Sequence, residues 1–278
     1  MENTRFIIKD YQKDNLGIGN IFKCLISAIS VNDDTVIQCY DDYIYGKYDT
    51  ILDDKFIYHN QTDKLLEKVY TCRLLIHKSE EDIQEDIPNE EWYLGGLENP
   101  NFDYLFSFTK RIDWNYNPDR INSIVKDRIF KNIDKIIFKP IIYNIVDYFY
   151  NSFKLNTSLG ISVRTWTSSH EGTIDRPYSF DIYKSKIMNV LINNMNIDKI
   201  VLSVDNESAL EQYLKIFEDI HIPCVVLKKD DRMNDIQFAI IKALTLAKCN
   251  YFIGNRISTF SELVFWFSRH TIKVYTVF

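Results

Sequence analysis

The sequence predicts an α/β protein whose second half is a Rossmann-like domain built around a parallel sheet. Short apolar segments alternate there with longer stretches in which apolar residues recur at helical spacing. That alternation is typical of βαβ units, whose strands run parallel. Two of the expected helices also begin with a capping box, Ser208-x-x-Glu211 and Thr259-x-x-Glu262. The 46% hydrophobic content is high enough to form packed cores.

The second half carries this pattern most clearly. Its apolar segments predict strands at residues 159–164, 199–204, 223–227, 251–254 and 272–278. Its amphipathic segments predict helices at residues 180–193, 208–217, 235–247 and from Thr259 onward. Each predicted strand is followed by a helix, except the last, so the order favours a doubly wound sheet.

The first half is less regular. We expect strands at residues 5–11, 35–40 and 69–77, with a tight turn at 15–20 and a helix at 21–30. The segment 119–153 predicts two helices, broken at Pro140. A polar stretch near 151–156 interrupts both patterns, so we expect one domain over residues 1–153 and a second over 154–278.

Composition and charge exclude several classes of partner. The chain has 278 residues and a net charge of −6, without a run rich in Lys or Arg, which argues against a nucleic-acid or anionic-membrane surface. No apolar run is long enough for a transmembrane helix, and the start lacks the pattern of a signal peptide. The five cysteines are widely spaced and lie mostly in apolar segments. They are typical of reduced core residues, so we expect a cytoplasmic protein.

Four polar segments follow predicted strands, where doubly wound sheets bind their ligands. The last of them joins the strand at 251–254 to the helix at Thr259, and such a turn directs free N–H groups and the positive end of a helix dipole at one point. That point suits a phosphate, although an ordinary capped turn explains the same residues. The four segments are Asn15-Leu-Gly-Ile-Gly-Asn20, Gly160-Ile-Ser-Val-Arg164, Leu202-Ser-Val-Asp-Asn-Glu-Ser208 and the turn with Ser258, Thr259 and Ser261.

In order and spacing, these segments resemble the GDP-fucose-dependent fucosyltransferases of GT-B fold. That family includes protein O-fucosyltransferases, nodulation α-1,6-fucosyltransferases and bacterial α-1,2-fucosyltransferases. Its G-x-G-N turn is matched by Gly17-Ile-Gly-Asn20, its H-x-R strand end by Ser162-Val-Arg164, and its T/S-D-[DS] turn by Val204-Asp205-Asn206. Its helix-opening Asp is matched by Asp235, and its following G-N…S-[ST]-F segment by residues 251–260. The resemblance covers residues 159–262 and 16–22.

The resemblance implies two Rossmann-like domains facing a cleft, with the acceptor bound by the first and the nucleotide sugar by the second. It implies an inverting, metal-independent transfer of L-fucose from GDP-L-fucose to a glycan hydroxyl, without a cofactor. Two departures leave alternatives open: Ser162 replaces the family's His, and Thr165 replaces the second Arg of several members. The same fold with another nucleotide-sugar donor, or a non-catalytic module that binds nucleotide sugars or glycans, would fit these departures.

Arg164 is the strongest candidate, because a guanidinium can fork onto the oxygens of a departing diphosphate. The alternative is a structural ion pair. By resemblance, Asp235 accepts hydrogen bonds from guanine, although it could simply cap its helix, and Asp205 either lines the nucleotide pocket or caps a helix. The remaining donor-binding candidates by resemblance are Gly17, Gly19, Asn20, Ser162, Ser258, Thr259, Phe260 and Ser261.

A catalytic base is expected shortly after the Arg164 strand. Inversion at the anomeric carbon requires a group that takes the proton of the acceptor hydroxyl. The α-1,6 branch of the family has a Glu in this region, and Glu171 lies one residue from that place, with His170 as second choice. A solvated loop is the alternative. We expect no metal, because GT-B enzymes offset diphosphate charge with Arg and helix termini, and no His/Cys spacing resembles a zinc site.

Overall fold

The structure is a computed structural model that divides by its contacts into two compact units. It describes residues 6–10, 18–31, 33, 35–38, 47–58, 68–72, 116–117, 119, 123–165, 178–255, 258–269 and 271–277. Unit 1 comprises residues 1–143 and 233–240, and unit 2 comprises residues 144–232 and 241–278. The sequence placed the boundary near residues 151–156, whereas the contacts divide the chain at 143–144 and assign the start of one later helix to unit 1.

Unit 1 contains a four-stranded parallel sheet, ordered β3-β2-β1-β4. Its strands are β1 (Phe6–Asp10), β2 (Thr35–Gln38), β3 (Ile57–Tyr58) and β4 (Lys68–Cys72). Helix α1 (Ile18–Val31) connects β1 to β2 and buries Phe22, Leu25 and Ile29. The helix begins three residues earlier than the sequence predicted, so Gly19 and Asn20 belong to its first turn rather than to a preceding loop.

Two helices follow in the part of the chain that the sequence assigned to a helix pair. They are α4 (Ser123–Ile133) and α5 (Pro140–Phe153). Pro140 is the first helical residue of α5, a position where its missing N–H group has no cost and its fixed φ suits the helix. In α4, the buried Asn132 side chain donates to the Ile26 carbonyl of α1 at 3.0 Å. The amide therefore fixes α4 against α1 inside unit 1.

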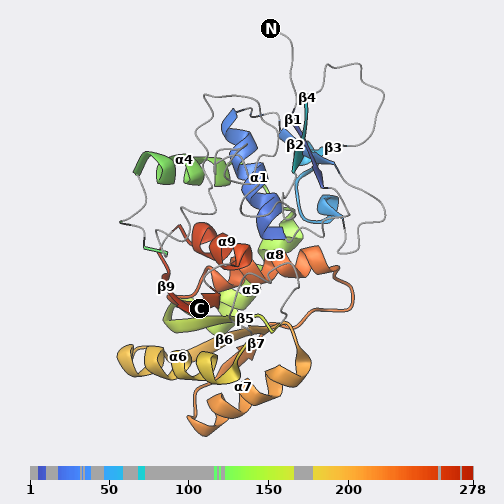
Figure 1. Cartoon of the computed structure of the whole chain (residues 1–278). Helices are drawn as coiled ribbons and strands as arrows, with labels where there is room; N and C mark the ends of the chain where they lie inside the picture. The colour runs from blue at the N-terminus through green and yellow to red at the C-terminus, as the bar shows by residue number, and fades with distance from the viewer. Residues whose placement is uncertain are drawn as a thin grey trace. The chain divides into compact units, whose positions relative to one another are not determined.

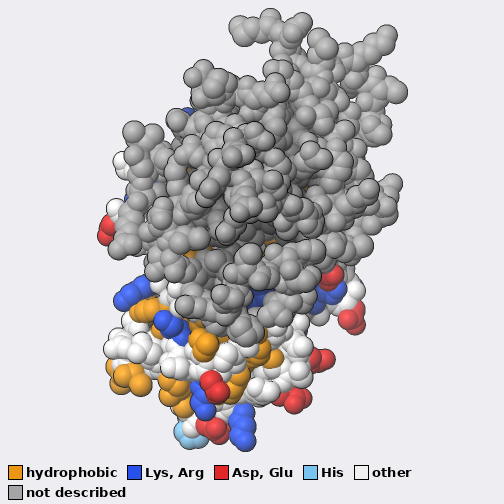
Figure 2. Space-filling view, in the orientation of Figure 1, with side chains coloured by type: hydrophobic (Ala, Val, Ile, Leu, Met, Phe, Trp, Pro, Cys, Tyr) orange, Lys and Arg blue, Asp and Glu red, His pale blue; other side chains and the backbone are white. Residues whose placement is uncertain are grey.

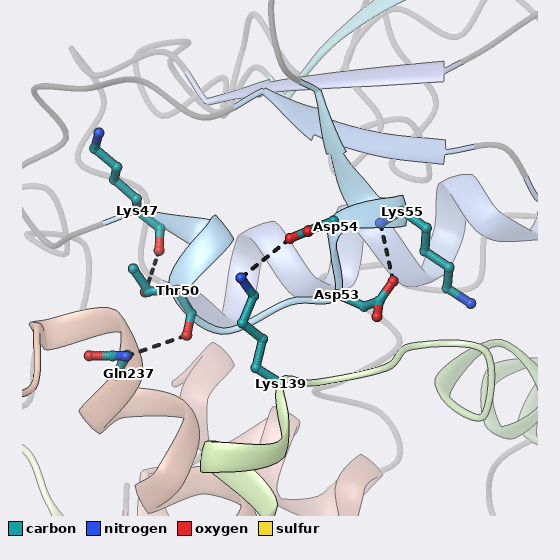
Figure 3. A network of polar contacts seen from close by, with 7 residues as sticks. All are labelled: Lys47, Thr50, Asp53, Asp54, Lys55, Lys139 and Gln237. Atoms are coloured by element: carbon teal, nitrogen blue, oxygen red, sulfur yellow. Dashed lines mark hydrogen bonds and ion pairs between the residues drawn. The ribbon is translucent and has the colours of Figure 1, made fainter.

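Short 3₁₀ helices complete the described part of unit 1. They are η2 (Tyr48–Thr50) and η3 (Asp54–Phe56), and in unit 2 η6 (Leu155–Thr157) precedes the sheet. The Asp53 side chain caps η3 by accepting from the Lys55 N–H group at 3.2 Å. Lys139 forms an ion pair with Asp54 at 3.3 Å, so the end of the α4–α5 connection is held to η3 (Figure 3).

Unit 2 contains a five-stranded parallel sheet, ordered β7-β6-β5-β8-β9. Its strands are β5 (Ser158–Val163), β6 (Lys199–Val204), β7 (Cys224–Val226), β8 (Tyr251–Asn255) and β9 (Lys273–Val277). The chain builds β5, β6 and β7 outward in one direction and then crosses back to add β8 and β9 on the other side of β5. This is the doubly wound order that the alternation predicted.

Helices cover both faces of this sheet (Figure 1). They are α6 (Phe180–Asn193), α7 (Glu207–Asp219), α8 (Asp235–Leu246) and α9 (Thr259–Phe267). Leu159, Ile161 and Val163 of β5 pack in one core with buried residues of α6 and α7. On the opposite face, a Cβ at Gly160 would lie 3.0 Å from Leu246, so the glycine lets the end of α8 approach the central strand closely.

The helix starts differ in detail from the predicted capping boxes. Asn206, not Ser208, is the N-cap of α7, and Ser258, not Thr259, is the N-cap of α9. Both predicted boxes are therefore wrong, because each motif begins inside the first helical turn. The strands and helices themselves lie close to the predicted ranges.

Cys224 and Cys249 are free thiols, and burial raises the pKa of each to about 12. Charged side chains of both signs are interspersed over the part of unit 2 visible in Figure 2. Among the described residues, no helix is both long and apolar enough to cross a bilayer.

Candidate functional site

The candidate site lies at the carboxyl edge of the unit 2 sheet, where the strand order reverses. β5 pairs with β6 on one side and with β8 on the other, so the reversal falls between β5 and β8. In doubly wound sheets this is the place where ligands bind. Arg164 directly follows β5, and the turn into α9 directly follows β8. Parallel pairing therefore puts the guanidinium-bearing residue and the start of α9 on neighbouring strand ends.

The start of α9 offers unused backbone donors. Ser258 occupies the N-cap position, but its side chain makes no capping hydrogen bond. The Ser258 carbonyl accepts from the Glu262 N–H group at 3.1 Å, which closes the first helical turn. Within the described residues, the N–H groups of Thr259 and Phe260 have no acceptor. Such groups, together with the helix dipole, suit an anion.

Gly254 and Ser261 shape this turn. A Cβ at Gly254 would lie 2.5 Å from the Ser261 hydroxyl oxygen and 2.6 Å from the Phe252 ring. Because the glycine leaves that space open, the hydroxyl of Ser261 accepts from the Asn255 N–H group at 3.1 Å. Ser261 is buried. Its hydrogen bond with Asn255 thus stabilises the connection between β8 and α9.

Glu262 is a buried residue that the sequence analysis did not select as a site candidate. It is fully buried in the first turn of α9, and its carboxylate accepts from the Trp266 indole N–H group at 3.5 Å. In the sequence, Glu262 is the last residue of the capping motif that begins at Thr259, which indicates a capping role and not a buried one. The signal that points to burial is the continuous apolar run that follows it, Leu263 to Phe265.

The backbone at Arg164 contacts Tyr183, a buried tyrosine of α6. The Tyr183 hydroxyl accepts from the Arg164 N–H group and donates to the Ser162 carbonyl, each at 3.5 Å. Burial raises the pKa of Tyr183 well above its ordinary value, so the hydroxyl stays protonated at neutral pH. The tyrosine therefore acts as a hydrogen-bonding support for the end of β5 and not as a base.

Two further tyrosines pack beside Tyr183. The hydroxyls of Tyr178 and Tyr213 lie 3.1 Å apart. The pKa of Tyr213 is raised mainly by burial and, to a smaller extent, by the hydrogen bond with Tyr178. The rings of Tyr183 and Tyr213 meet edge to face at 6.2 Å. This cluster could not be predicted from the sequence, because each tyrosine by itself is indistinguishable from an ordinary core aromatic.

Asp205 binds the residue that follows Arg164. Its carboxylate accepts from the Thr165 N–H group at 2.8 and 3.1 Å and from the Thr165 hydroxyl at 2.7 Å. The adjacent Asn206 caps α7, accepting from the N–H groups of Ser208 at 2.9 Å and Ala209 at 3.3 Å. The alternative that Asp205 caps this helix is therefore excluded.

Asp235 is the first residue of α8 and belongs to unit 1. The capping of α8 is done by its neighbours: the Asn234 side chain accepts from the Gln237 N–H group at 2.8 Å, and the Gln237 side chain accepts from the Asn234 N–H group at 3.0 Å. This reciprocal pair is a capping box, so the alternative that Asp235 is the cap is excluded. Asp235 is exposed at the start of the helix.

The same helix start is joined to η2. The Asn234 amide donates to the Thr50 hydroxyl at 2.9 Å. The Gln237 amide donates to the Thr50 carbonyl at 3.4 Å (Figure 3). The Thr50 hydroxyl in turn donates to the Lys47 carbonyl at 2.5 Å. Asp235 is thereby placed by contacts within unit 1.

The other predicted residues are distributed as follows. Ser162 lies in β5 opposite Ser203 of β6, and Gly19 and Asn20 lie in the first turn of α1 in unit 1. Arg164, Ser162, Asp205, Ser258, Thr259, Phe260 and Ser261 all belong to the carboxyl edge in unit 2. Gly17, His170 and Glu171 lie outside the described residues.

A cavity of about 600 Å³ lies away from this edge. Its lining includes Asn156 and Asn250, which precede β5 and β8, so it opens at the amino edge of the same sheet. Lys248 and Arg269 also line it and follow the ends of α8 and α9, where cations offset the negative end of each helix dipole. The position of the cavity therefore does not mark the candidate site. In the described parts of the chain, no group of three or more His, Cys, Asp or Glu side chains is arranged to hold a metal ion.

Comparison with solved structures identifies the fold. POFUT1 in complex with GDP-fucose matches with a TM-score of 0.51 and 10% identity, covering 99% of this chain and 98% of that one. The fucosyltransferase NodZ from Bradyrhizobium matches with a TM-score of 0.51 and 18% identity, covering 94% and 91%. This chain has the fold of the GDP-fucose-dependent fucosyltransferases. The predicted GT-B-like α/β class is thereby confirmed.

Two other comparisons, with protein-family models and with curated proteins, give no match. A second POFUT1 structure, in complex with GDP, matches with a TM-score of 0.51 and 10% identity over 99% of this chain and 98% of that one. Both neighbouring proteins are thus similar over almost the whole chain, and at low identity.

Proposed function

We propose that this protein is an inverting glycosyltransferase that transfers L-fucose from GDP-L-fucose to a hydroxyl of a glycan. The observation that carries the proposal is the placement of Arg164 and the start of α9 on adjacent strand ends at the reversal of the sheet. The shared fold supports it, because the solved neighbours include POFUT1 bound to GDP-fucose and to GDP.

The chemistry follows from the leaving group. When the bond between fucose and the diphosphate breaks, negative charge grows on the diphosphate oxygens. Arg164 neutralises this charge with forked hydrogen bonds, and the N–H groups of Thr259 and Phe260 add donors in a fixed position. The site holds these donors in place before the reaction, so they need little reorganisation when the charge develops. Asp235 is the proposed partner of the guanine edge, and Ser258 and Ser261 complete the turn.

The proton of the acceptor hydroxyl requires a base. We assign this role to Glu171, with His170 as the alternative. Tyr183 is unsuited to it, because burial raises the pKa of Tyr183 and keeps its hydroxyl protonated. Both candidates follow Thr165 closely in sequence.

Two other functions have specific support. Ser162 and Thr165, in place of the family's His and second Arg, favour the same reaction with a different nucleotide-sugar donor. The same substitutions fit a module that binds nucleotide sugars or glycans without turnover. A thermal-shift comparison of GDP, UDP and dTDP separates the donors, because a bound nucleotide raises the melting temperature by mass action.

Release of GDP from GDP-fucose tests the proposal. We expect slow release by the wild-type protein and faster release with a suitable glycan. Arg164→Ala should lower the affinity for GDP by roughly tenfold to a hundredfold, since a hydrogen bond to a charged group contributes about 1.5–3 kcal/mol. Isothermal titration calorimetry measures this affinity. Lys199→Ala is the matched control, because Lys199 is a cation at the amino end of the neighbouring strand.

The possible outcomes separate the three functions. Release from another nucleotide sugar but not from GDP-fucose would replace the donor. GDP binding without turnover of any donor would favour the non-catalytic module. Equal loss of GDP affinity in Arg164→Ala and Lys199→Ala would contradict the role of Arg164.

A further inference from the structure

We propose that Asp205 is a positioning residue that holds Arg164 in place through Thr165. The inference rests on the proposed role of Arg164 at the diphosphate. It assigns Asp205 a role other than the direct donor contact that the sequence resemblance implied. The contacts that carry it lie entirely within unit 2.

We call the contacts between the Asp205 carboxylate and Thr165 the clamp. Its position follows from the register of the sheet. Val163 of β5 is paired with Val204 of β6, and this is the last pair of the ladder. One residue further, the Asp205 carboxylate accepts from the Thr165 N–H group at 2.8 Å. A side-chain oxygen thus continues the pairing after the backbone ladder ends. Arg164 lies between the last ladder pair and this bond.

The hydroxyl of Thr165 adds a second hydrogen bond to the clamp. It donates to the same Asp205 oxygen at 2.7 Å, so both donors of one residue converge on one carboxylate. On the other side of Arg164, the Tyr183 hydroxyl contacts the Arg164 N–H group and the Ser162 carbonyl at 3.5 Å. The backbone at Arg164 is therefore fixed on both flanks. A guanidinium on a fixed backbone loses less conformational freedom when it binds an anion.

Charge argues against a direct contact between Asp205 and the diphosphate. A carboxylate beside phosphate oxygens would repel them, and like charges in close contact destabilise binding. Its oxygens are instead directed at the donors of Thr165. The carboxylate therefore acts on the anion through the arginine that it holds.

Thr165 is one of the two departures from the family pattern, and it has a structural role in this chain. Where several members of the resembling family carry a second Arg, this chain has a threonine whose hydroxyl binds Asp205. Valine at this position would keep the shape and the N–H group but lose the hydroxyl bond. The clamp is thus a property of this chain's own residues.

The chain contains a matched control pair at the other end of the same two strands. Thr157 precedes β5 and Asp198 precedes β6, and the Thr157 hydroxyl donates to the Asp198 carboxylate at 2.7 Å. The hydrogen bond to Thr157 is the main cause that lowers the pKa of Asp198. The two pairs share a hydrogen bond from a threonine hydroxyl to an aspartate carboxylate, and they occupy opposite edges of the sheet. They differ in that the Asp205 carboxylate also accepts from the Thr165 N–H group, whereas Asp198 forms an ion pair with Lys199 at 3.3 Å.

The experiment measures GDP affinity by isothermal titration calorimetry and melting temperature for both pairs. Asp205→Ala should weaken GDP binding roughly tenfold, and Thr165→Val severalfold, because part or all of the clamp is lost. Thr157→Val and Asp198→Ala should change the melting temperature by similar amounts and leave GDP affinity unchanged. The double variant Arg164→Ala/Asp205→Ala should bind GDP no more weakly than Arg164→Ala alone.

Two results would overturn the proposal. If the effects of Arg164→Ala and Asp205→Ala multiply, Asp205 contacts the donor independently. If Asp205→Ala binds GDP like the wild type, Arg164 does not depend on the clamp.

Hydrogen exchange separates failure of the clamp from failure of the proposed function. The Thr165 amide should exchange faster in Asp205→Ala than in Asp198→Ala, whether or not GDP binds. Unchanged exchange at Thr165 would disprove the clamp even if GDP binds. If the wild type binds no nucleotide, the proposed function fails and, with it, the role assigned to Asp205 at Arg164.

Discussion

Gly254 is the residue on which the β8–α9 turn depends most directly. Its missing side chain leaves the space that the Ser261 hydroxyl and the Phe252 ring occupy. Protein interiors are close-packed, so an added methyl group here forces neighbouring atoms to move. The sequence alone indicates only that a glycine lies at the end of an apolar strand. The reason for the glycine becomes visible once α9 is folded back onto β8.

Gly254→Ala should destabilise the protein by about 1–3 kcal/mol, because the new Cβ would overlap two side chains of the turn. Urea denaturation measures the change in the free energy of unfolding. Gly160→Ala is the graded comparison: its Cβ would lie 3.0 Å from Leu246 and 3.2 Å from Cys249, at flexible side-chain atoms. A variant at Gly254 that is as stable as the wild type would contradict this account of the turn.

At the scale of elements, the helix starts are better defined by the structure than by the motifs. α7 is capped by Asn206, which accepts from two N–H groups and from the Ser208 hydroxyl. α8 is capped by Asn234, whose side chain accepts from the Gln237 N–H group, while the Gln237 side chain accepts from the Asn234 N–H group. A capping box is recognised in sequence only as two suitable residues three positions apart, and several overlapping pairs fit the same segment. The competing choices are separated only when the backbone is placed.

Asn206→Ala should destabilise the protein by about 1 kcal/mol, the usual cost of losing an N-cap. Glu211→Ala should have almost no effect, although the predicted box gave Glu211 the reciprocal role. Thermal unfolding of both variants measures the difference. Equal destabilisation by the two substitutions would favour the box at Ser208 over the cap at Asn206.

The elements of unit 2 could be predicted from sequence because its strands are buried and its helices amphipathic. The apolar run at β6 and the helical pattern of α6 were both predicted with the residues that form them. The site was predicted in part: the strand-end positions of Arg164 and Asp205 follow from the alternation. The contact between Asp205 and Thr165 could not be predicted, because it joins residues that lie 40 positions apart in sequence.

At the scale of the whole molecule, the order β7-β6-β5-β8-β9 is what brings distant segments to one edge. Arg164 and Thr259 are far apart in the chain, and they follow strands that are hydrogen-bonded neighbours. The resemblance to fucosyltransferases agrees with the fold that the structural comparisons find. Unit 1 also contains residues 233–240, which are remote in sequence from residues 1–143. A single domain boundary along the sequence could not predict this division.

A crystal structure with GDP bound tests the central claim most directly. We expect the diphosphate to accept hydrogen bonds from the Arg164 guanidinium and from the N–H groups of Thr259 and Phe260. GDP bound with its diphosphate out of reach of Arg164, for example in the cavity at the amino edge, would contradict the account.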